Sequence, residues 1–164
     1  YVCGFFSESL ARRLVSVEYY MTLGGTAYGH LATTGRAVSE LLRAVFDELN
    51  IGYFGGTIDA EITWGRRKRR SEPARLHKSL TMGSYSVEDR LIRIHPTLDR
   101  PDVPGYYLAW IVYHEMLHQK HGIPEAGGRR QFHPPSFLAE ERLFDEYERA
   151  HRWEREHHHR LLCY

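Results

Sequence analysis

The pattern of hydrophobic residues between residues 38 and 64 predicts a helix followed by a strand. From Val38 to Leu49, apolar residues recur at intervals of three and four, which places them on one face of an α-helix. In Thr57–Trp64, apolar and polar residues alternate, as they do in a strand with one buried face. We therefore expect an amphipathic helix and then a half-buried strand, after an earlier helix over about Glu8–Met21.

Two shorter patterns add strands to the same sheet. Leu80–Val87 and Arg90–His95 are strand candidates, and Glu88-Asp89 forms the turn between them. Strands joined by so short a turn run in opposite directions. The sequence therefore predicts a small, mostly antiparallel sheet.

Two long helices are predicted in the second half of the chain. Pro104 suits the first turn of a helix and Gly122 its end, so Pro104–His121 is predicted as a helix of about five turns. A second helix is predicted over Ser136–Arg160, because Glu and Arg recur there at spacings that allow ion pairs along one face. The segment Ile123–Pro135 between the two helices is expected to be irregular.

Length and composition favour one soluble globular domain over residues 1–164. The chain is 42% hydrophobic and contains no run of about 18 uncharged apolar residues, so no membrane partner is expected. Its two cysteines, Cys3 and Cys163, lie near opposite ends and form no Cys-x-x-Cys pair. We therefore expect an intracellular, reducing location.

The helix predicted over Pro104–His121 carries a His-Glu-x-x-His motif, made by His114, Glu115 and His118. Residues four apart lie on one face of a helix, one turn above the other, so both imidazoles can reach one metal ion. Zinc lowers the pKa of its bound water and polarises a carbonyl oxygen, and Glu115 can accept the proton of that water. The motif predicts peptide hydrolysis, although its three fixed positions also recur by chance.

A catalytic zinc ion usually has three protein ligands and a water, so a third ligand is needed. His121 shares a helix face with His114, but seven residues of helix rise about 10 Å, too far for one metal with bonds of about 2 Å. His133, in the irregular segment, is the preferred candidate, and Glu140 and Glu141 are the alternatives. We expect one zinc ion per chain, held by the two histidines of the motif and His133.

Four segments between residues 49 and 137 form a recognisable combination. They are Leu49–Gly56 (LNIGYFGG), Ile62–Trp64 (ITW), Tyr113–His118 (YHEMLH) and His133–Phe137 (HPPSF). Through these segments the chain resembles the SprT/Spartan family of metalloproteases. The resemblance implies a compact domain in which a helix and a sheet precede the active-site helix.

The resemblance also bears on the third ligand and on partners. In that family a third histidine lies in a Gly-His-Gly-x-x-Phe-like segment, and His133 and Phe137 stand at the matching positions, while Phe132 and Pro134 replace the glycines. The four-cysteine zinc ribbon that bacterial members commonly carry has no counterpart in this sequence. Eukaryotic members cleave proteins crosslinked to DNA. The resemblance therefore implies DNA as a partner, DNA repair as a role, and the cytoplasm, nucleoid or nucleus as the location.

Together, these observations predict an α+β fold: a small zincin-like metalloprotease domain with an N-terminal helix, a mostly antiparallel sheet, an active-site helix and a C-terminal helix. The expected function is that of a zinc-dependent endopeptidase acting on protein or polypeptide substrates. The alternative is a non-catalytic, zinc-containing module that binds nucleic acid or protein. Glu115 favours the enzyme, because a structural zinc site usually has four protein ligands and no use for a general base.

Five consecutive basic residues follow the first predicted strand, although the formal net charge of the chain is only +1. They are Arg66, Arg67, Lys68, Arg69 and Arg70. Adjacent positive charges can bind the phosphates of nucleic acid and release counterions. A solvated hairpin tip explains the same residues. Both interpretations remain open from the sequence.

Two smaller features complete the expectations. In zincin sheets, an edge strand beside the active-site helix accepts the substrate as an additional strand, and Leu80–Ser86 is the candidate for this role. The tract His157–His159 lies near the end of the last predicted helix. Consecutive helical positions point about 100° apart, so we expect this tract on the surface rather than around one metal.

Overall fold

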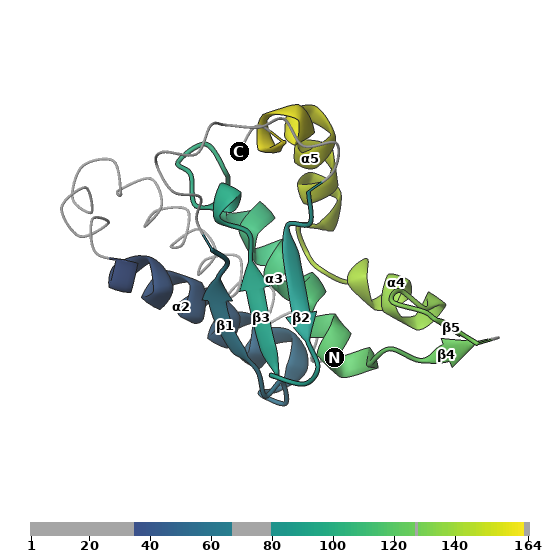
Figure 1. Cartoon of the computed structure of the whole chain (residues 1–164). Coiled ribbons are helices and arrows are strands. Elements are labelled where there is room, and N and C mark those ends of the chain that lie inside the picture. Colours follow the sequence, from purple (N-terminus) through teal and green to yellow (C-terminus); the bar gives the residue numbers. More distant parts are fainter. Residues whose placement is uncertain (1–34, 67–79, 127, 163–164) are drawn as a thin grey trace, which may run out of the picture.

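The computed structural model describes residues 35–66, 80–126 and 128–162 (Figure 1). The helices in this part of the chain are α2 (Gly35–Phe54), α3 (Gly105–His121), α4 (Pro135–Glu141) and α5 (Tyr147–Leu161). The main sheet is formed by β1 (Glu61–Trp64), β2 (Gly83–Ser86) and β3 (Leu91–Ile94), and a short 3-10 helix, η1 (Pro96–Leu98), follows it. Helices and a small sheet thus share one fold, as the expected α+β class requires.

The order of strands in the sheet is β1-β3-β2, so β2 lies at an edge. β2 and β3 form the expected antiparallel hairpin, in which Tyr85 pairs with Ile92. β1 and β3 run parallel, with Ile62 opposite Ile92. The sheet is therefore mixed rather than mostly antiparallel. The sequence patterns and the turn at Glu88-Asp89 indicated all three strands, but they contain no information on which strand becomes the neighbour of β1.

The amphipathic helix extends beyond the predicted Val38–Leu49, to Phe54. The side chain of Asn50 joins it by hydrogen bonds to the segment that precedes β1. The amide of Asn50 donates a hydrogen bond to the carbonyl oxygen of Ile58 at 2.9 Å and accepts one from the Ile58 N–H at 3.0 Å. Gly55 and Gly56 form the turn between the end of α2 and Ile58. Their φ angles are +60° and +77°, a region that glycine adopts without steric strain.

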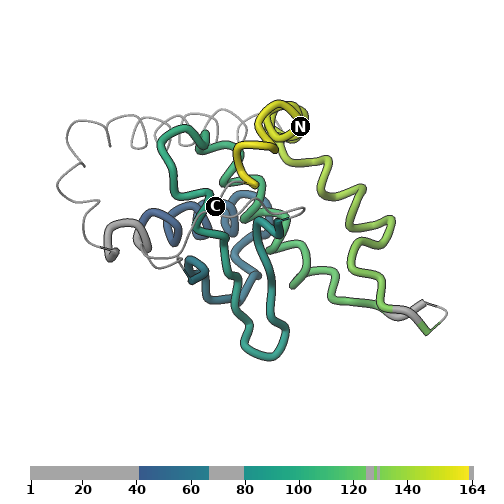
Figure 2. The backbone as a smooth tube through the Cα atoms, turned by 45° about the horizontal axis from the view of Figure 1, so that its top comes forward, coloured from purple at the N-terminus to yellow at the C-terminus, as the bar shows by residue number. Residues whose placement is uncertain are grey.

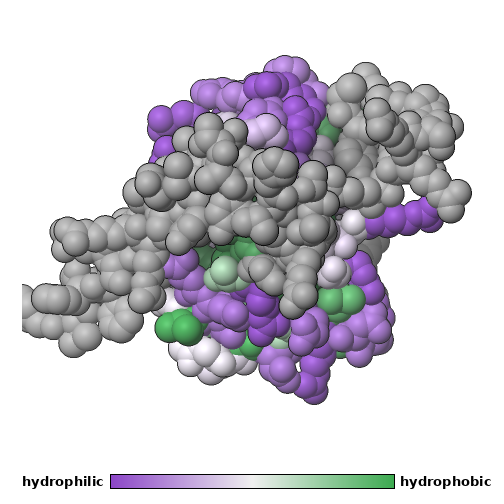
Figure 3. Space-filling view, turned by 90° about the vertical axis from the view of Figure 1, so that its left-hand side faces the viewer, coloured by the Kyte–Doolittle hydropathy of each residue, from purple (hydrophilic) through white to green (hydrophobic). Residues whose placement is uncertain are grey.

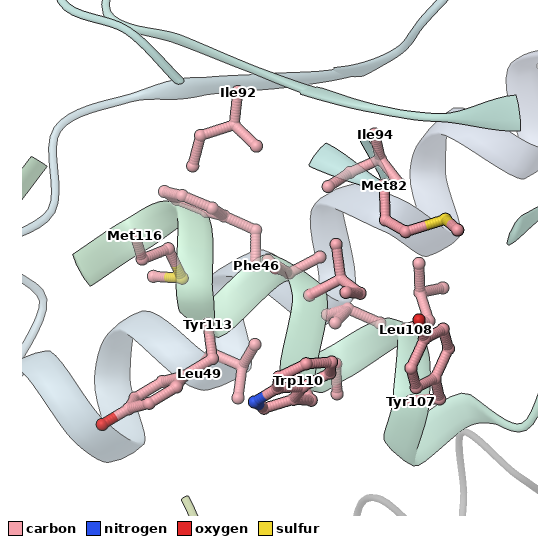
Figure 4. Packing of buried hydrophobic residues seen from close by; sticks show 14 of the residues in the cluster. Phe46, Leu49, Met82, Ile92, Ile94, Tyr107, Leu108, Trp110, Tyr113 and Met116 are labelled. Atoms are coloured by element: carbon pink, nitrogen blue, oxygen red, sulfur yellow. The ribbon is translucent and has the colours of Figure 1, made fainter. Parts of the chain in front are cut away.

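The hydrophobic core lies between the sheet and helices α2 and α3 (Figure 4). In β3 the side chains alternate, so that Ile92 and Ile94 are buried while Arg93 is exposed. Each large apolar side chain that becomes fully buried stabilises the fold by about 1.5–3 kcal/mol. The core residues shown in Figure 4 include Phe46, Leu49, Ile92, Ile94, Tyr107, Leu108, Tyr113 and Met116.

Helix α3 is the central element of this fold, and its bounds agree with the predicted range Pro104–His121. Every residue from Gly105 to Tyr113 is buried, and the helix contacts β2, β3, α2, α4 and α5. The helix ends at Gly122, whose φ is +64° and whose N–H donates to the carbonyl oxygen of His118 at 3.0 Å. Packing on all sides gives the motif residues of α3 a rigid support.

The predicted helix Ser136–Arg160 is wrong, because the chain forms α4 and α5 with a break at residues 142–146. Tertiary contacts explain the break. Phe144 is only 2% exposed and stacks on Tyr113 with ring centroids 5.3 Å apart. The N–H of Asp145 donates to the hydroxyl of Tyr53 at 3.2 Å. These contacts bind the chain to α2 and α3 at the break.

The segment Ile123–Pro135 was expected to be irregular, but it contains a small hairpin. Its strands are β4 (Glu125–Ala126) and β5 (Arg129–Arg130), which pair antiparallel. Gly128, with φ of +74°, lies in the turn. In Figure 1 this hairpin lies at the end of the molecule farthest from α2, and in Figure 2 the chain that leads from α3 and the chain that returns to α4 extend toward the same end.

Several expectations fall on residues outside the described ranges. These are the helix Glu8–Met21 and, within the basic run, Arg67, Lys68, Arg69 and Arg70. Arg66 is described and is exposed. On the face drawn in Figure 3, the visible described residues are mostly hydrophilic, with hydrophobic ones in small separate groups. Among the described residues, no helix has the length and apolar character needed to cross a membrane.

Candidate metal centre

Three histidines come together beside helix α3. His114 and His118 belong to the helix, and His133 lies on the chain between β5 and α4. One ring nitrogen of each lies within 4.8 Å of the corresponding nitrogen of the other two, which is close enough for one metal ion. The Nε2 atoms of His114 and His133 are 3.2 Å apart. Two nitrogens bound at about 2.05 Å to a tetrahedral zinc ion are roughly 3.3 Å apart, so this spacing fits a shared metal.

A buried phenylalanine holds the three imidazole rings in place. Phe137, in α4, is 0% exposed. Its ring centroid is 5.0 Å from that of His114, and 4.8 Å from those of both His118 and His133. Pro135 at the first turn fixes the start of α4. Phe137 thereby connects the fixed helix α3 to the loop that supplies His133.

Glu141 was an alternative third ligand in the sequence analysis. In the structure it bonds to His114, one of the proposed ligands, instead. Its Oε1 is 2.6 Å from Nδ1 of His114, and its side chain is 9% exposed. An ionised carboxylate can only accept a hydrogen bond, so Nδ1 of His114 donates and the lone pair remains on Nε2. Nε2 is the atom that faces His133. Carboxylate partners of this kind commonly orient histidines that bind metals.

Glu140, the other alternative ligand, connects the end of α3 to α4. Its Oε2 accepts from Nε2 of His121 at 2.8 Å, and its Oε1 accepts from Lys120. Burial alone would raise the pKa of Glu140, but the hydrogen bonds and charges of Lys120 and His121 outweigh burial and lower it. His121 also lies 3.3 Å from the Ser136 hydroxyl. His121 and Glu140 thus fasten the two helices, in agreement with the exclusion of His121 as a ligand.

Two of the three histidines, His118 and His133, are held in the form that binds metals. Burial, with added repulsion from His114 and His133, lowers the pKa of His118 to about 4. Partial burial and the proximity of His114 lower the pKa of His133. Both rings are therefore neutral near pH 7, and a neutral imidazole has a lone pair to donate.

Glu115 is buried beside this cluster and faces the edge strand. It is only 4% exposed, and burial raises the pKa of its carboxyl group to about 7, although the proximity of His114 opposes this shift. No donor among the described residues hydrogen-bonds to the carboxylate. A carboxyl group in this state can gain and lose a proton near neutral pH.

A pocket of about 320 Å³ joins these groups. Its walls come from α3, from β2 and from the chain on either side of the β4–β5 hairpin. Ile123 and the half-exposed Phe132 add apolar surface beside His133. The arrangement can hold a metal ion and present it, together with one buried carboxyl group, to a ligand that enters along β2.

The sequence analysis missed the roles of two residues of the site, Glu141 and Gly83. Glu141 was considered only as a ligand, although the usual hydrogen bond between a ligating histidine and a carboxylate was a signal for its role. Gly83 of β2, which lies against Glu115, gave no signal because only the fold brings strand and helix together. Comparisons of the chain with protein-family models, with curated proteins and with solved structures found no match.

Proposed function

We propose that this chain is a zinc-dependent endopeptidase of the SprT-like type, acting on extended segments of protein substrates. The observation that carries the proposal is that one pocket contains three metal-competent histidines, one buried carboxyl group and an edge strand. Each component has a separate role in peptide hydrolysis. The sequence resemblance over residues 49–137 supports the same assignment.

Zinc fits the donor set better than magnesium or calcium does. Three imidazoles suit zinc, copper, iron and nickel, whereas magnesium and calcium require mostly oxygen ligands. Three protein ligands leave a fourth position open, as in catalytic zinc sites. When bound, zinc would supply Lewis acidity toward a peptide carbonyl and would lower the pKa of a water molecule.

Glu115 is the proposed general base. Glu115 lines the same pocket as the three histidines of the cluster, so its carboxyl group lies near the proposed metal ligands. With a pKa of about 7, it can accept the proton of the attacking water and return it to the leaving amine. A closed structural zinc site has no such group, so Glu115 supports catalysis over a purely structural centre.

Strand β2 is the proposed docking site for substrate. It is an edge of the sheet, and residues of this strand line the pocket. An extended peptide can add to such an edge through main-chain hydrogen bonds, which are independent of side-chain identity. This mode favours unfolded or flexible polypeptides. The apolar surface of Ile123 and Phe132 is available for a substrate side chain near the metal.

DNA stimulation is proposed on narrower grounds. The resemblance implies DNA-associated substrates, and the basic run Arg66–Arg70 begins two residues after β1 ends at Trp64. Phosphate contacts from that run would concentrate a DNA-bound protein near the site.

One experiment tests the function directly. The purified chain is assayed for bound metals and for cleavage of an unfolded protein, with and without single-stranded DNA. We expect about one zinc ion per chain, as three histidine ligands imply, and cleavage that stops on chelation and returns with added zinc. Stoichiometric zinc without cleavage of any unfolded protein would instead identify a non-catalytic zinc module.

A further inference from the structure

Gly83 of β2 lies directly against the carboxyl group of Glu115. A Cβ atom at position 83 would be 2.5 Å from Oε1 of Glu115, 2.7 Å from Cγ and 2.9 Å from Cδ. Carbon atoms make favourable contacts with their neighbours only at about 3.5–4.0 Å. Any side chain at position 83 would therefore overlap the Glu115 side chain as it now lies.

The backbone gives no other reason for glycine at this position. The φ of Gly83 is not among the positive values, which occur at Gly55, Gly56, Gly122 and Gly128. A glycine inside a strand weakens the strand, because it adds no packing and loses more entropy on folding. The close approach of Glu115 is thus the structural feature that requires glycine here.

An added methyl group at position 83 would displace the Glu115 side chain of α3 rather than the backbone of β2. Gly83 pairs with Ile94 of β3, and the adjoining Met82 carbonyl accepts a hydrogen bond from the His95 N–H at 2.8 Å. Ile94 is fully buried in the core. The atoms of Glu115 nearest to Gly83 are Oε1, Cγ and Cδ, which all lie beyond Cβ in a flexible side chain that can rotate into the adjoining pocket. A shift of about 1 Å restores normal contact.

We propose that Gly83 is a positioning residue for peptide hydrolysis, because the missing side chain allows the Glu115 carboxyl group to lie beneath the edge strand, in the pocket that the three histidines also line. This inference rests on the proposed function and adds to it a residue outside the His-Glu-x-x-His motif. It also assigns β2 a second role. The strand that would bind the substrate also fixes the location of the base.

The test compares Gly83→Ala with wild type. We expect kcat on an unfolded protein to fall about 100-fold, the loss that a displacement of about 1 Å can cause, while KM changes little. Zinc content should remain at the wild-type level, since the three atoms nearest to a Cβ at position 83 all belong to Glu115 and none belongs to a histidine of the cluster. Gly65→Ala is the matched control. A Cβ there would meet only the Ile94 carbonyl oxygen at 3.4 Å and Pro96 Cδ at 3.5 Å, so activity should be unchanged.

A crystal structure of Gly83→Ala provides a readout that does not depend on activity. We expect the Glu115 carboxyl group to be displaced by about 1 Å or more, with β2 and the three histidines in their wild-type places. A carboxyl group that has not moved, or a variant with wild-type kcat, overturns the inference. If wild type cleaves no substrate, the proposed function fails, and this structure still decides whether Gly83 places Glu115.

Discussion

Two buried glutamates lie next to His114, and they differ in what surrounds their carboxyl groups. Glu141, at the end of α4, is 7% exposed and holds Nδ1 of His114 at 2.6 Å. Glu115, on α3 against β2, is 4% exposed and has no hydrogen-bond donor among the described residues. Burial raises the pKa of Glu115 to about 7.

The comparison shows that the partner, rather than burial, assigns a role to a carboxyl group. A carboxylate with a fixed hydrogen-bond partner orients that partner. A carboxyl group that is buried without one is destabilised in its charged form and exchanges a proton more readily near neutral pH. We therefore expect Glu141 to act on metal affinity and Glu115 to act on the rate of cleavage.

The largest effect is expected for Glu115→Gln. The amide preserves the shape of the side chain but cannot accept a proton, so cleavage should fall about 100- to 10,000-fold, equivalent to about 3–5 kcal/mol in the barrier. Zinc content and the melting temperature should remain close to wild type. Kinetics on an unfolded protein, with zinc measured on the same sample, check this. An unchanged rate would remove Glu115 from the mechanism.

His133→Ala is expected to have the next largest effect. It removes one of three imidazoles, so zinc retained after dialysis should fall well below one ion per chain. His121→Ala is the matched control, because His121 is engaged with Glu140 and lies outside the cluster. Full zinc occupancy in His133→Ala, with loss in a Glu140 or Glu141 variant, would contradict the assignment of His133 as the third ligand.

Glu141→Gln sharpens the comparison, because it repeats the same chemical change on the other glutamate. The amide can still accept from Nδ1 of His114, but it lacks the negative charge. We expect zinc affinity to fall about 10-fold, at the lower end of the range for outer-shell partners, and kcat at saturating zinc to stay near wild type. Competition with a chelator measures the affinity. A larger loss of kcat than of affinity would remove the distinction between the two glutamates.

The sequence predicts the part of the site that one helix contains. His114 and His118 share a face of α3 through helical spacing alone, and Glu115 directly follows the first of them, so this part of the motif is a local property. His133 could be predicted as the third ligand from its residue type and from the resemblance of its segment to the SprT/Spartan family. The contact of Gly83 with Glu115 could not be predicted, because it depends on which strand forms the edge above α3.

The fold shows the same division between local and tertiary information. The β2–β3 hairpin and the limits of α3 follow from turn and cap residues close to them in sequence. Nearby residues do not determine the parallel pairing of β1 with β3 or the break between α4 and α5. At that break, burial of Phe144 against Tyr113 overrides the charge spacing that favoured a continuous helix.

The smallest effect is expected for Glu140→Gln. Glu140 lies next to Glu141, but its carboxylate bonds to none of the three histidines of the cluster. Glu140 bonds to Lys120 and His121, and its pKa is lowered below the ordinary value of 4.5, since these partners outweigh the opposing effect of burial. A carboxyl group whose pKa is lower in the folded state adds stability above its unfolded pKa and loses it as the pH falls through its folded pKa.

At pH 7, Glu140→Gln should therefore lower the free energy of unfolding by less than about 1 kcal/mol, because ion pairs with an exposed partner contribute little. The difference between variant and wild type should stay constant as the pH is lowered from 7 to about 4.5, and should shrink as the pH then falls through the folded pKa of Glu140 and the wild-type carboxyl group loses its charge. Urea unfolding of both proteins across this range measures the difference. Glu156→Gln, on the exposed part of α5, is the control and should show no such dependence. A difference that is as large below the folded pKa of Glu140 as at pH 7 would mean that Glu140 stabilises the α3–α4 junction through packing rather than through its charge.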